Sequence, residues 1–413
     1  MADTQRLELR TITETEFADY HQMISETFGG DDHEDNVKTD RTVAEYDRNW
    51  AALDGDQFVG AAGAFSRTMT VPGGELPVAA VTSVAVRPTH RRRGVLTSLM
   101  RAQLHDLHDR RAEPVAVLWA SEALIYGRFG YGLGARGANL RVDLTRAAYR
   151  PGINTGEGRV ELLDREKALP DLRTVYDAQR VRVPGFLDRR DAWWDFVLRD
   201  AERHREGRTA LRFAVVREPD GSASGYAAYA QKPAWGENGP DSEVLVRDLA
   251  ASTPQGYAAI WKFLFGIDLH RRLTAGHAAA DEVLPHLLLD ARAAQLRVGD
   301  QLWIRVVDAG RALSARRYAV PLDVVLDLTD DFCPWNTGRW RLTGDADAAR
   351  CERTHEPADL ELTAAELGAI YLGGTTPAQL AAAGRIRELT PGAVARTTLA
   401  FRAEREPWCP EVF

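Results

Sequence analysis

The stretch from Val81 to Leu96, VTSVAVRPTHRRRGVL, constrains the fold of this chain more than any other. It begins with the alternating apolar residues of a β-strand. After Pro88 the spacing becomes that of an amphipathic helix, which we expect to begin near Gly94 and to end near Arg110. A strand followed by a short turn and a helix predicts an α/β unit, with the turn at the N-terminus of the helix.

This turn carries three consecutive arginines before a glycine, Arg91–Gly94. The first N–H groups of a helix have no intrahelical partner and lie at the positive end of its dipole, so they suit a phosphate or pyrophosphate. Gly94 permits close approach of the backbone, and the arginines add positive charge. The simpler interpretation is a solvated basic turn. A P-loop for nucleoside triphosphates is excluded, because no Lys-Ser or Lys-Thr follows the glycine.

Length and composition place the chain among globular proteins. With 413 residues, it is expected to contain about two to four domains. A formal net charge of −8 argues against a nucleic-acid partner. Cys333, Cys351 and Cys409 lie far apart without metal-ligand spacing, so we expect neither a zinc site nor a disulfide framework. No apolar run of about eighteen residues and no apolar leader occurs, which predicts a cytoplasmic protein without a membrane partner.

The string Arg91–Leu96 resembles the acyl-CoA-binding motif of the GNAT acetyltransferase superfamily, Gln/Arg-x-x-Gly-x-Gly/Ala, with Leu96 where the superfamily usually has Gly or Ala. Residues 119 to 132, WASEALIYGRFGYG, together with PTHRRRG, are similar to the enhanced intracellular survival (Eis) family of GNAT acetyltransferases. The combination is far more specific than either piece. It implies an acetyl-CoA-dependent N-acetyltransferase.

The resemblance also implies where acetyl-CoA binds: at the end of the strand, on the arginine turn and at the start of the following helix. The residues expected to hold it are Val84, Ala85, Val86, Arg91, Arg92, Arg93, Gly94, Val95, Leu96, Thr97, Ser121 and Glu122. Ser121 is expected to be the N-cap of a short helix after a strand. No metal is expected.

The expected fold class combines α/β and α+β: tandem GNAT-fold domains followed by a sterol carrier protein-like α+β domain. We expect a catalytic domain over 1–147 and, over 148–295, a degenerate GNAT-like domain. Residues 243–266 repeat the order of strand, turn and helix, but without the arginines or the motif glycine. The third domain is expected over 296–413, with its C-terminus entering the active site.

Within the first domain the patterns predict particular elements. Helices are expected around Glu14–Phe28 and Val43–Asn49, and strands near Phe58–Phe65 and Thr68–Val71. A strand over Ala138–Leu144 is expected to close this domain.

Two residues are assigned catalytic roles by the resemblance, namely Tyr126 as general acid and the terminal carboxylate of Phe413 as general base. A phenol with a pKa of about 10 is reasonably matched to a thiol with a pKa of about 8.5. The residue pattern alone favours a half-buried aromatic at Tyr126 and a loose tail at Phe413. Capping, exposure or packing adequately explains the other base candidates of this domain, which are His90, His105, His108 and Glu122.

The acidic segment GGDDHED, residues 29–35, is expected near the mouth of the acceptor pocket if the fold is GNAT. Asp31, Asp32, Glu34 and Asp35 would attract a cationic amine such as an aminoglycoside, or a lysine-bearing substrate, although a solvated acidic loop is the commoner explanation. Ser83 and Val412 differ from residues of some family members. The alternatives are a non-catalytic carrier of lipids or other hydrophobic ligands and an acyl-CoA sensor. The family also implies a homo-oligomer, a hexamer.

Overall fold

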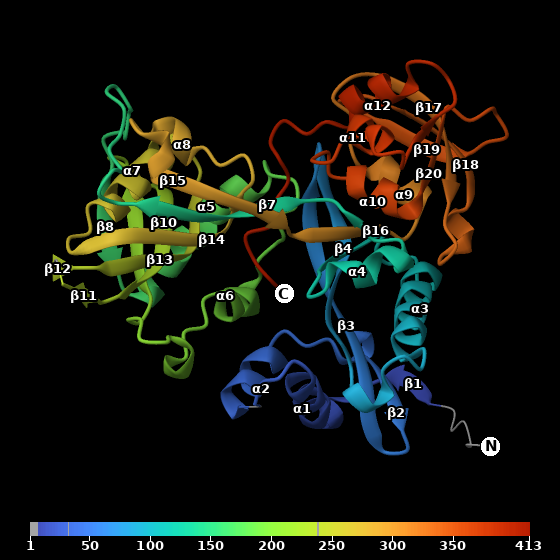
Figure 1. Ribbon diagram of the computed structural model, residues 1–413, viewed down its shortest axis with the longest axis horizontal. Coiled ribbons are helices and arrows are strands. Elements are labelled where there is room, and N and C mark those ends of the chain that lie inside the picture. Colours follow the sequence, from blue (N-terminus) through green and yellow to red (C-terminus); the bar gives the residue numbers. More distant parts are fainter. Residues whose placement is uncertain (1–6, 32, 238) are drawn as a thin grey trace.

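The computed structural model describes residues 7–31, 33–237 and 239–413. Three α/β units lie side by side, and the end of the chain runs between them (Figure 1). The first and third units share one hydrophobic core, in which Val78 and Val117 pack with Ile304, Leu326 and Ile370. This shared core makes the first and third units one packed body.

The first sheet has the strand order β1-β2-β3-β4-β5-β16-β6 within the described residues. Its strands are β1 (Glu8–Thr11), β2 (Trp50–Asp54), β3 (Gln57–Val71), β4 (Gly74–Val86), β5 (Val115–Trp119), β16 (Leu302–Val306) and β6 (Gly132–Leu133). The helices of this unit are η1 (Glu14–Glu16), α1 (Phe17–Thr27), α2 (Glu34–Arg41), η2 (Tyr46–Arg48), η3 (Pro88–His90), α3 (Val95–Asp109), α4 (Ala123–Tyr126) and η4 (Gly127–Phe129).

The second sheet has the order β15-β7-β14-β13-β10-β9-β8. Its strands are β15 (Ala294–Asp300), β7 (Arg136–Asp143), β14 (His270–Ala279), β13 (Ser242–Ala251), β10 (Ala223–Lys232), β9 (Arg212–Arg217) and β8 (Arg159–Leu163), and β11 (Trp235–Gly236) pairs with β12 (Gly239–Pro240) beside it. Its helices are α5 (Arg165–Arg180), α6 (Asp191–Val197), η5 (Glu202–His204), α7 (Pro254–Phe265), α8 (Leu284–Leu287) and η6 (Ala291–Ala293).

The third unit is built on the sheet β19-β18-β17-β20-β21. Its elements are α9 (Ala309–Ala315), β17 (Leu322–Thr329), η7 (Pro334–Asn336), β18 (Gly338–Gly344), β19 (Ala349–Arg353), β20 (Leu360–Thr363), α10 (Ala364–Ile370), α11 (Pro377–Ala382), β21 (Arg387–Glu388) and α12 (Ala393–Phe401). The helix α10 begins with a capping box between Thr363 and Glu366, as its sequence favours.

The first two units exchange strands. β7 directly follows the first unit in sequence, yet it pairs with β14 and β15 in the second sheet. In return, β16 pairs with β5 along Leu302–Val306 and so enters the first sheet. The expected strand over 138–144 therefore does not close the first unit, whereas the expected limits at 147 and 295 stay predictions of where the domains divide.

Other local expectations have mixed outcomes. The helix expected over 94–110 is confirmed as α3. The two expected strands near 58–65 and 68–71 form one strand, β3, because paired β4 runs alongside without interruption at that point. The expected helix near Val43–Asn49 is wrong: a helix lies earlier, at α2, and only a short 3-10 turn, η2, follows. In α2, acidic residues in the first turn and Lys38 and Arg41 in the last complement the helix dipole.

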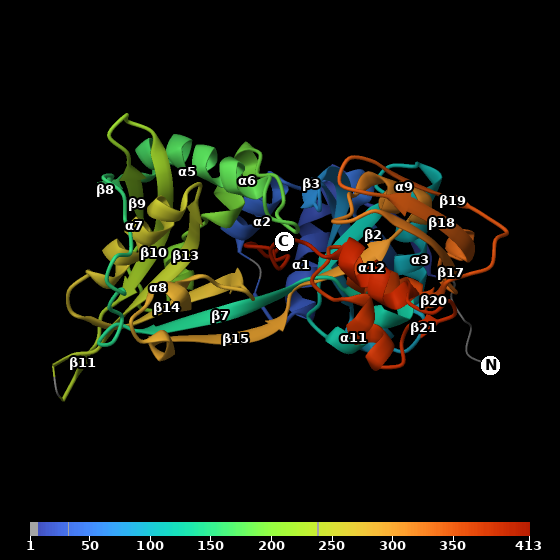
Figure 2. The same ribbon diagram turned by 90° about the horizontal axis from the view of Figure 1, so that it is seen from above.

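The C-terminal segment after α12 returns to the centre of the molecule, where Figures 1 and 2 both place the end of the chain between the units. The Trp408 backbone N–H donates to the carbonyl of Pro184 at 3.1 Å, and its ring packs edge-on against Phe186. Phe413 is buried, with 9% of its surface exposed. The tail is therefore held in place by packing.

Candidate active site

The parallel strands β4 and β5 separate partway along their length. They pair from Val78 opposite Val115 to Val81 opposite Leu118, and no further. Just beyond, Ser83 has a φ of 54°, and the register of β3 and β4 shifts at this point. This bulge turns β4 away from β5, as bulges near functional sites often do. The separation leaves an opening in the middle of the sheet.

A cavity of about 360 Å³ occupies this opening, and we call it the transfer cavity. Its lining residues are Phe28, Val81, Thr82, Ser83, Val84, Trp119, Ala120, Ser121, Tyr126, Val412 and Phe413. The end of the chain thus meets the end of α4 there. Tyr126 and Phe413, which the sequence analysis assigned to catalysis from opposite parts of the chain, line the same cavity.

The arginine turn opens directly into α3. Arg91–Arg93 are exposed, and Arg92 and Gly94 have φ values of 61° and 81°. A Cβ atom at Gly94 would meet nothing within 4 Å, so the space above the helix start is open. No side chain among the described residues caps α3. Its first N–H groups are therefore available to an anion.

The equivalent helix of the second unit, α7, is closed by contrast. The Gly256 N–H donates to the Thr253 hydroxyl oxygen at 3.0 Å, and Pro254 removes a further N–H donor. An anion would have to compete with this cap. The difference between α3 and α7 favours the first unit as the one that binds a phosphorylated ligand.

The remaining residues expected to bind the cofactor differ in how they can act. Val84, Val86, Leu96 and Thr97 are half-buried, whereas Ala85 and Val95 are buried in the core. Ala85 and Val95 can therefore contact a ligand only through the backbone. The expectation that Ser121 caps a helix is wrong, because α4 begins at Ala123 and Glu122 occupies the cap without a side-chain bond. Both Ser121 and Glu122 are exposed, and Ser121 lines the transfer cavity.

Tyr126 is the last residue of α4 and is buried, with 5% of its surface exposed. Its ring lies edge-on to Tyr131, with centroids 5.9 Å apart. Burial, with a smaller contribution from the charge of Glu122, raises the pKa of Tyr126 to about 12. The phenol is therefore protonated at neutral pH and able to donate.

The tail is positioned by Glu411, which is buried between the first two units. One carboxylate oxygen accepts from Arg67 of β3 at 2.7 Å, and the other accepts from Arg189, just before α6, at 2.6 Å. Arg189 also pairs with Asp248 of β13 at 2.8 Å, and the pKa of Arg189 is raised by Asp248 and the other anionic or ionisable groups around it despite its burial. We call these four residues the tail clamp. Tyr226 donates to Asp248 at 2.7 Å beside it. The clamp lies two residues before Phe413.

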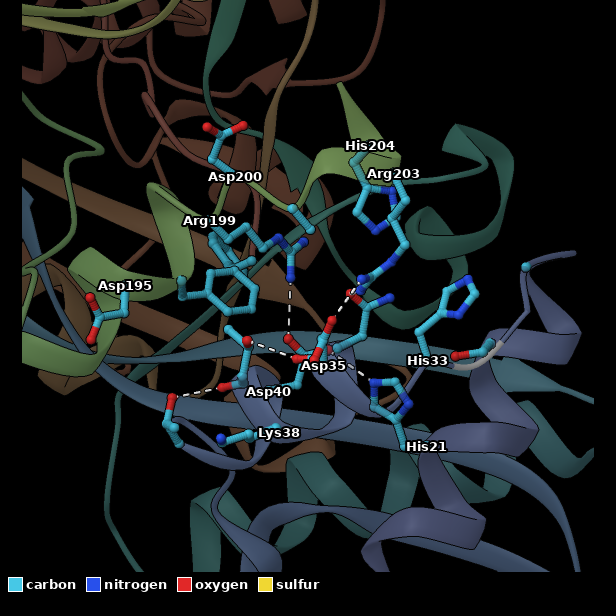
Figure 3. A pocket seen from close by; sticks show the side chains of 18 of the residues that line it. His21, His33, Asp35, Lys38, Asp40, Asp195, Arg199, Asp200, Arg203 and His204 are labelled. Atoms are coloured by element: carbon cyan, nitrogen blue, oxygen red, sulfur yellow. Dashed lines mark hydrogen bonds and ion pairs between the residues drawn. The ribbon is translucent and has the colours of Figure 1, made fainter. Parts of the chain in front are cut away.

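A second cavity, of about 1310 Å³, adjoins the transfer cavity, and we call it the acceptor cavity. The two share Phe28, Thr82, Ser83 and Phe413. Figure 3 shows its charged lining, in which Arg199 and Arg203 of the second unit reach Asp40 and Asp35 of α2.

The acidic segment of residues 29–35 is only partly at this cavity. Asp31 and Asp35 line it, and Asp35 is paired with Arg203 at 2.9 Å. Glu34 begins α2 and does not line it, and Asp32 lies outside the described residues. The segment is therefore not wholly a loop, and part of its charge is neutralised.

His277, which was not among the residues expected from the sequence, lines the acceptor cavity from β14. It has a φ of 54° at a bulge between Ala275 and Ala278, and its ring lies 5.1 Å from that of Trp119. Burial, together with the charge of Arg247, lowers its pKa. No motif marked this histidine, because only the bulge turns it toward the first unit.

The base candidates of the first unit are engaged elsewhere. His90 is buried with Nε2 3.1 Å from a carboxylate oxygen of Asp54. His105 and His108 contact the Trp335 ring of the third unit. Among the residues that the structure describes, none of these three histidines lines the transfer cavity or the acceptor cavity.

Family models match the chain in three places. Residues 8–134 and 185–306 each match an acetyltransferase (GNAT) domain, and residues 309–410 match a sterol carrier protein domain. An uncharacterized N-acetyltransferase of Streptomyces avermitilis is 43% identical over 408 residues, covering 98% of this chain and 99% of that protein. N-acetyltransferase Eis of Mycobacterium tuberculosis is 35% identical over 380 residues, covering 89% of this chain and 88% of that protein. The chain belongs to the Eis family of GNAT N-acetyltransferases.

The crystal structure of Eis1 from Mycobacterium abscessus is also similar, with a TM-score of 0.84, 31% identity and coverage of 98% of this chain and 100% of that one. Membership of the Eis family confirms the expected fold class, two GNAT domains and a sterol carrier protein domain, and it makes the chain an N-acetyltransferase. This favours an enzyme over a carrier or a sensor without turnover.

GNAT acetyltransferases use acetyl-CoA, and the open start of α3 beside the separated strands fits that donor. Across residues 7–31, 33–237 and 239–413, no three His, Cys, Asp or Glu side chains are grouped to hold a metal ion. Nor is any helix in those ranges long and apolar enough to cross a membrane.

Proposed function

We propose that this Eis-family member transfers the acetyl group of acetyl-CoA to a primary amine, with Tyr126 as general acid and the α-carboxylate of Phe413 as general base. The observation that carries the proposal is the position of these two residues. Both line the transfer cavity, and Phe413 also lines the acceptor cavity. The proton donor and the proton acceptor thus flank the place where donor and amine meet.

The donor is proposed to lie across the opening of the first sheet. The backbone of Val84–Val86 edges the pantetheine arm, and Arg91–Thr97 hold the pyrophosphate through α3 amides and arginine side chains. Ser121 and Glu122 are the remaining residues proposed to contact acetyl-CoA. The open space at Gly94 and the absence of a side-chain cap on α3 support this assignment.

The chemistry needs two protons removed from the amine nitrogen and one supplied to the leaving thiolate. The amine reaches the site as an ammonium, whose proton passes to the Phe413 carboxylate. The freed nitrogen then attacks the thioester carbonyl, so a C–N bond forms as the C–S bond breaks. Tyr126 gives its phenolic proton to the departing thiolate. The phenolate then takes the second proton of the nitrogen as the neutral amide forms, and the Phe413 carboxyl group releases its proton to solvent before the next turnover. A free α-carboxyl has a pKa of about 3.5, so Phe413 also serves by holding the cationic amine in place.

The acceptor class follows the family expectation of cationic amines such as aminoglycosides or lysine side chains. Asp31 at the acceptor cavity supports attraction of an ammonium group, as does the partly neutralised Asp35. A hexameric assembly is proposed with it, and analytical ultracentrifugation tests that assembly directly.

The test is thiol release from acetyl-CoA in the presence of kanamycin, tobramycin or a lysine-containing peptide. We compare the protein ending at Phe413 with one extended by a short Gly-Ser segment after Phe413. Turnover that the extension abolishes, with acetyl-CoA binding preserved, supports both the activity and the carboxylate. Full activity of the extended protein removes Phe413 from the mechanism. Acetyl-CoA binding without turnover on any amine contradicts the proposed transfer.

A further inference from the structure

The acceptor cavity has walls of opposite character. The first unit contributes three carboxylates and one lysine: Asp31, Asp35, Asp40 and Lys38. The second unit contributes six arginines and two carboxylates: Arg165, Arg199, Arg203, Arg205, Arg208, Arg247, Asp195 and Asp200. The cavity is therefore bipolar, acidic toward the first unit and basic toward the second.

Most of these arginines already have a carboxylate partner. The pairs are Arg165 with Asp195 (2.7 Å), Arg199 with Asp40 (3.2 Å), Arg203 with Asp35 (2.9 Å), Arg205 with Asp200 (2.9 Å) and Arg208 with Glu206 (3.1 Å). Arg247 differs. Within the described residues it has no carboxylate within 4.0 Å, and its Nε and Nη2 both donate to the carbonyl of Val197 at a long 3.3 Å. Among the described residues of the basic wall, Arg247 is thus the arginine that forms no ion pair.

The backbone aims Arg247 into the cavity. The parallel pairing of β13 and β14 ends with Val246 opposite Ala275, the same kind of separation that forms the transfer cavity in the first unit. On the other side of β13, Tyr229 of β10 pairs with Val246, and Ala228 pairs with Asp248. Arg247 therefore lies at a bulge, opposite no residue of β10 in this register. Its side chain is exposed in the acceptor cavity while its neighbours on the strand are buried.

The basic wall is connected to the transfer cavity by neighbouring side chains. His277, the next group along β14, is close enough for the charge of Arg247 to lower its pKa. The ring of His277 lies 5.1 Å from that of Trp119, and Trp119 lines the transfer cavity with Tyr126. A single elongated molecule could therefore contact Arg247 while its other end reaches the catalytic pair.

The surroundings of Arg247 favour an anion. Partial enclosure of the guanidinium and the charges of Arg199 and Arg208 lower the pKa of Arg247, and the more distant carboxylates of Asp248 and Asp200 offset this only in part. The Nε of Arg208 is buried and has no hydrogen-bond partner among the described residues. Guanidinium groups bind planar oxyanions through parallel N–H donors, and partial exclusion of water strengthens the attraction.

We infer that the acceptor carries an oxyanion, a carboxylate or a phosphate, which Arg247 binds beside Arg199 and Arg208 while the amine of the same molecule extends toward Tyr126 and Phe413. The inference rests on the proposed function for the role of the amine. It narrows the acceptor class proposed above: amines that also carry an acidic group, such as an amino acid, a lysine-bearing peptide or a phosphorylated amine, fit both walls better than aminoglycosides, which lack one. The second unit thus supplies acceptor recognition.

The test uses linear ω-amino acids of increasing length, from 4-aminobutanoate to 12-aminododecanoate, each compared with its own primary amide. Binding to the full-length protein in the presence of CoA is measured by calorimetry. At the chain length that reaches from Arg247 to Tyr126 and Phe413, we expect the carboxylate to bind at least tenfold tighter than the amide. In Arg247→Gln this preference disappears, whereas Arg165→Gln, which loses an arginine already paired with Asp195, keeps it.

Equal binding of acids and amides at every length, or a preference that survives Arg247→Gln, overturns the inference. Arg247→Lys, which keeps the charge without the planar fork, should retain part of the preference and shows whether loss in the glutamine variant comes from misfolding. Aminoalkyl phosphates in the same assay distinguish the two oxyanions: tighter binding than the carboxylates identifies phosphate.

Acetyl transfer is measured on the same compounds in parallel. A carboxylate preference in binding without acetylation supports the inference and contradicts the proposed function. Acetylation with no preference for the carboxylate supports the proposed function and contradicts the inference.

Discussion

Tyr126 differs from its neighbour Tyr131 in what its hydroxyl can reach. Tyr126 lines the transfer cavity, whereas the hydroxyl of Tyr131 is buried without a hydrogen-bond partner in the described structure. We expect Tyr126→Phe to lower kcat by about 10²- to 10⁴-fold, the usual contribution of a positioned general acid, with little change in acetyl-CoA affinity. Tyr131→Phe is the matched control and should retain most of the activity. Comparable losses in both variants would mean that packing, and not proton donation, explains the effect.

The pH dependence of the rate also tests Tyr126. Because burial raises its pKa to about 12, the phenol stays protonated from neutral pH to well above pH 10, and its ionisation should not reduce kcat in that range. A decline caused by Tyr126 should begin only when the pH approaches 12. A loss of kcat with a midpoint near pH 9 that is present in the native enzyme and absent from the residual activity of Tyr126→Phe would contradict this protonation state.

Glu411 joins the tail to both GNAT units. In Glu411→Gln, Arg67 and Arg189 each lose a carboxylate oxygen in a buried setting, and we expect the free energy of unfolding to fall by about 3 kcal/mol. The activity should fall further than the stability suggests, because Phe413 is two residues away. Glu406→Gln is the control on the same tail, since its contact with Arg136 is longer, at 3.5 Å, and partly exposed. Thermal melting and kcat/KM measure both effects, and identical results for the two variants would argue against the clamp.

Single residues also mark the limit of sequence reasoning. The polar residues Ser66 and Arg67 interrupt the apolar pattern and favour two strands, yet β3 runs through them. Arg67 is tolerated there because it pairs with Glu411, 344 residues later in the chain. Local patterns cannot reveal such a partner. The same holds for Arg247 and His277, whose positions depend on bulges and on the packing of a second unit.

Among the elements, α3 and α7 show how one arrangement serves two purposes. Strand, turn and helix recur in both units, but only the α7 start is closed, by Thr253. The start of α3 was predictable because its helix period, glycine and arginines are adjacent in sequence. Ser121 was misplaced because α4 is a single turn, and so short a helix carries too little periodicity to mark its first residue.

The arginine turn should contribute to donor affinity through charge. For the double variant Arg92→Gln, Arg93→Gln we expect KM for acetyl-CoA to rise roughly tenfold with kcat little changed, since exposed charges each contribute up to about 1 kcal/mol. Arg110→Gln at the opposite end of α3 is the control and should leave KM unchanged. Steady-state kinetics at low and high salt check this: the native KM should rise with salt, and that of the double variant should respond less. A fall in kcat with KM constant would contradict this role.

At the scale of the whole molecule, the first unit is incomplete without residues far along the chain. β16 pairs with both β5 and β6, and its Leu302 and Ile304 are buried in the core shared with the third unit. We expect a fragment of residues 1–147 to lack a cooperative thermal transition, because β5 would be left as an open edge with a divided core. Circular dichroism and limited proteolysis of this fragment, beside the full chain, measure it. A protease-resistant fragment with a sharp melt would contradict the expectation.

The exchange of β7 and β16 has a consequence for synthesis on the ribosome. In the sequence, β6 is followed by the whole second unit. The strand β16, which pairs with both β5 and β6, emerges on the order of 170 residues after β6. At translation rates of about 5 to 20 residues per second, the nascent chain waits roughly 10 to 30 s with the edge of β5 unpaired. We expect the N-terminal unit to depend on chaperones during that interval, so slower elongation between residues 133 and 302 should lower the yield of folded enzyme more than slower elongation elsewhere.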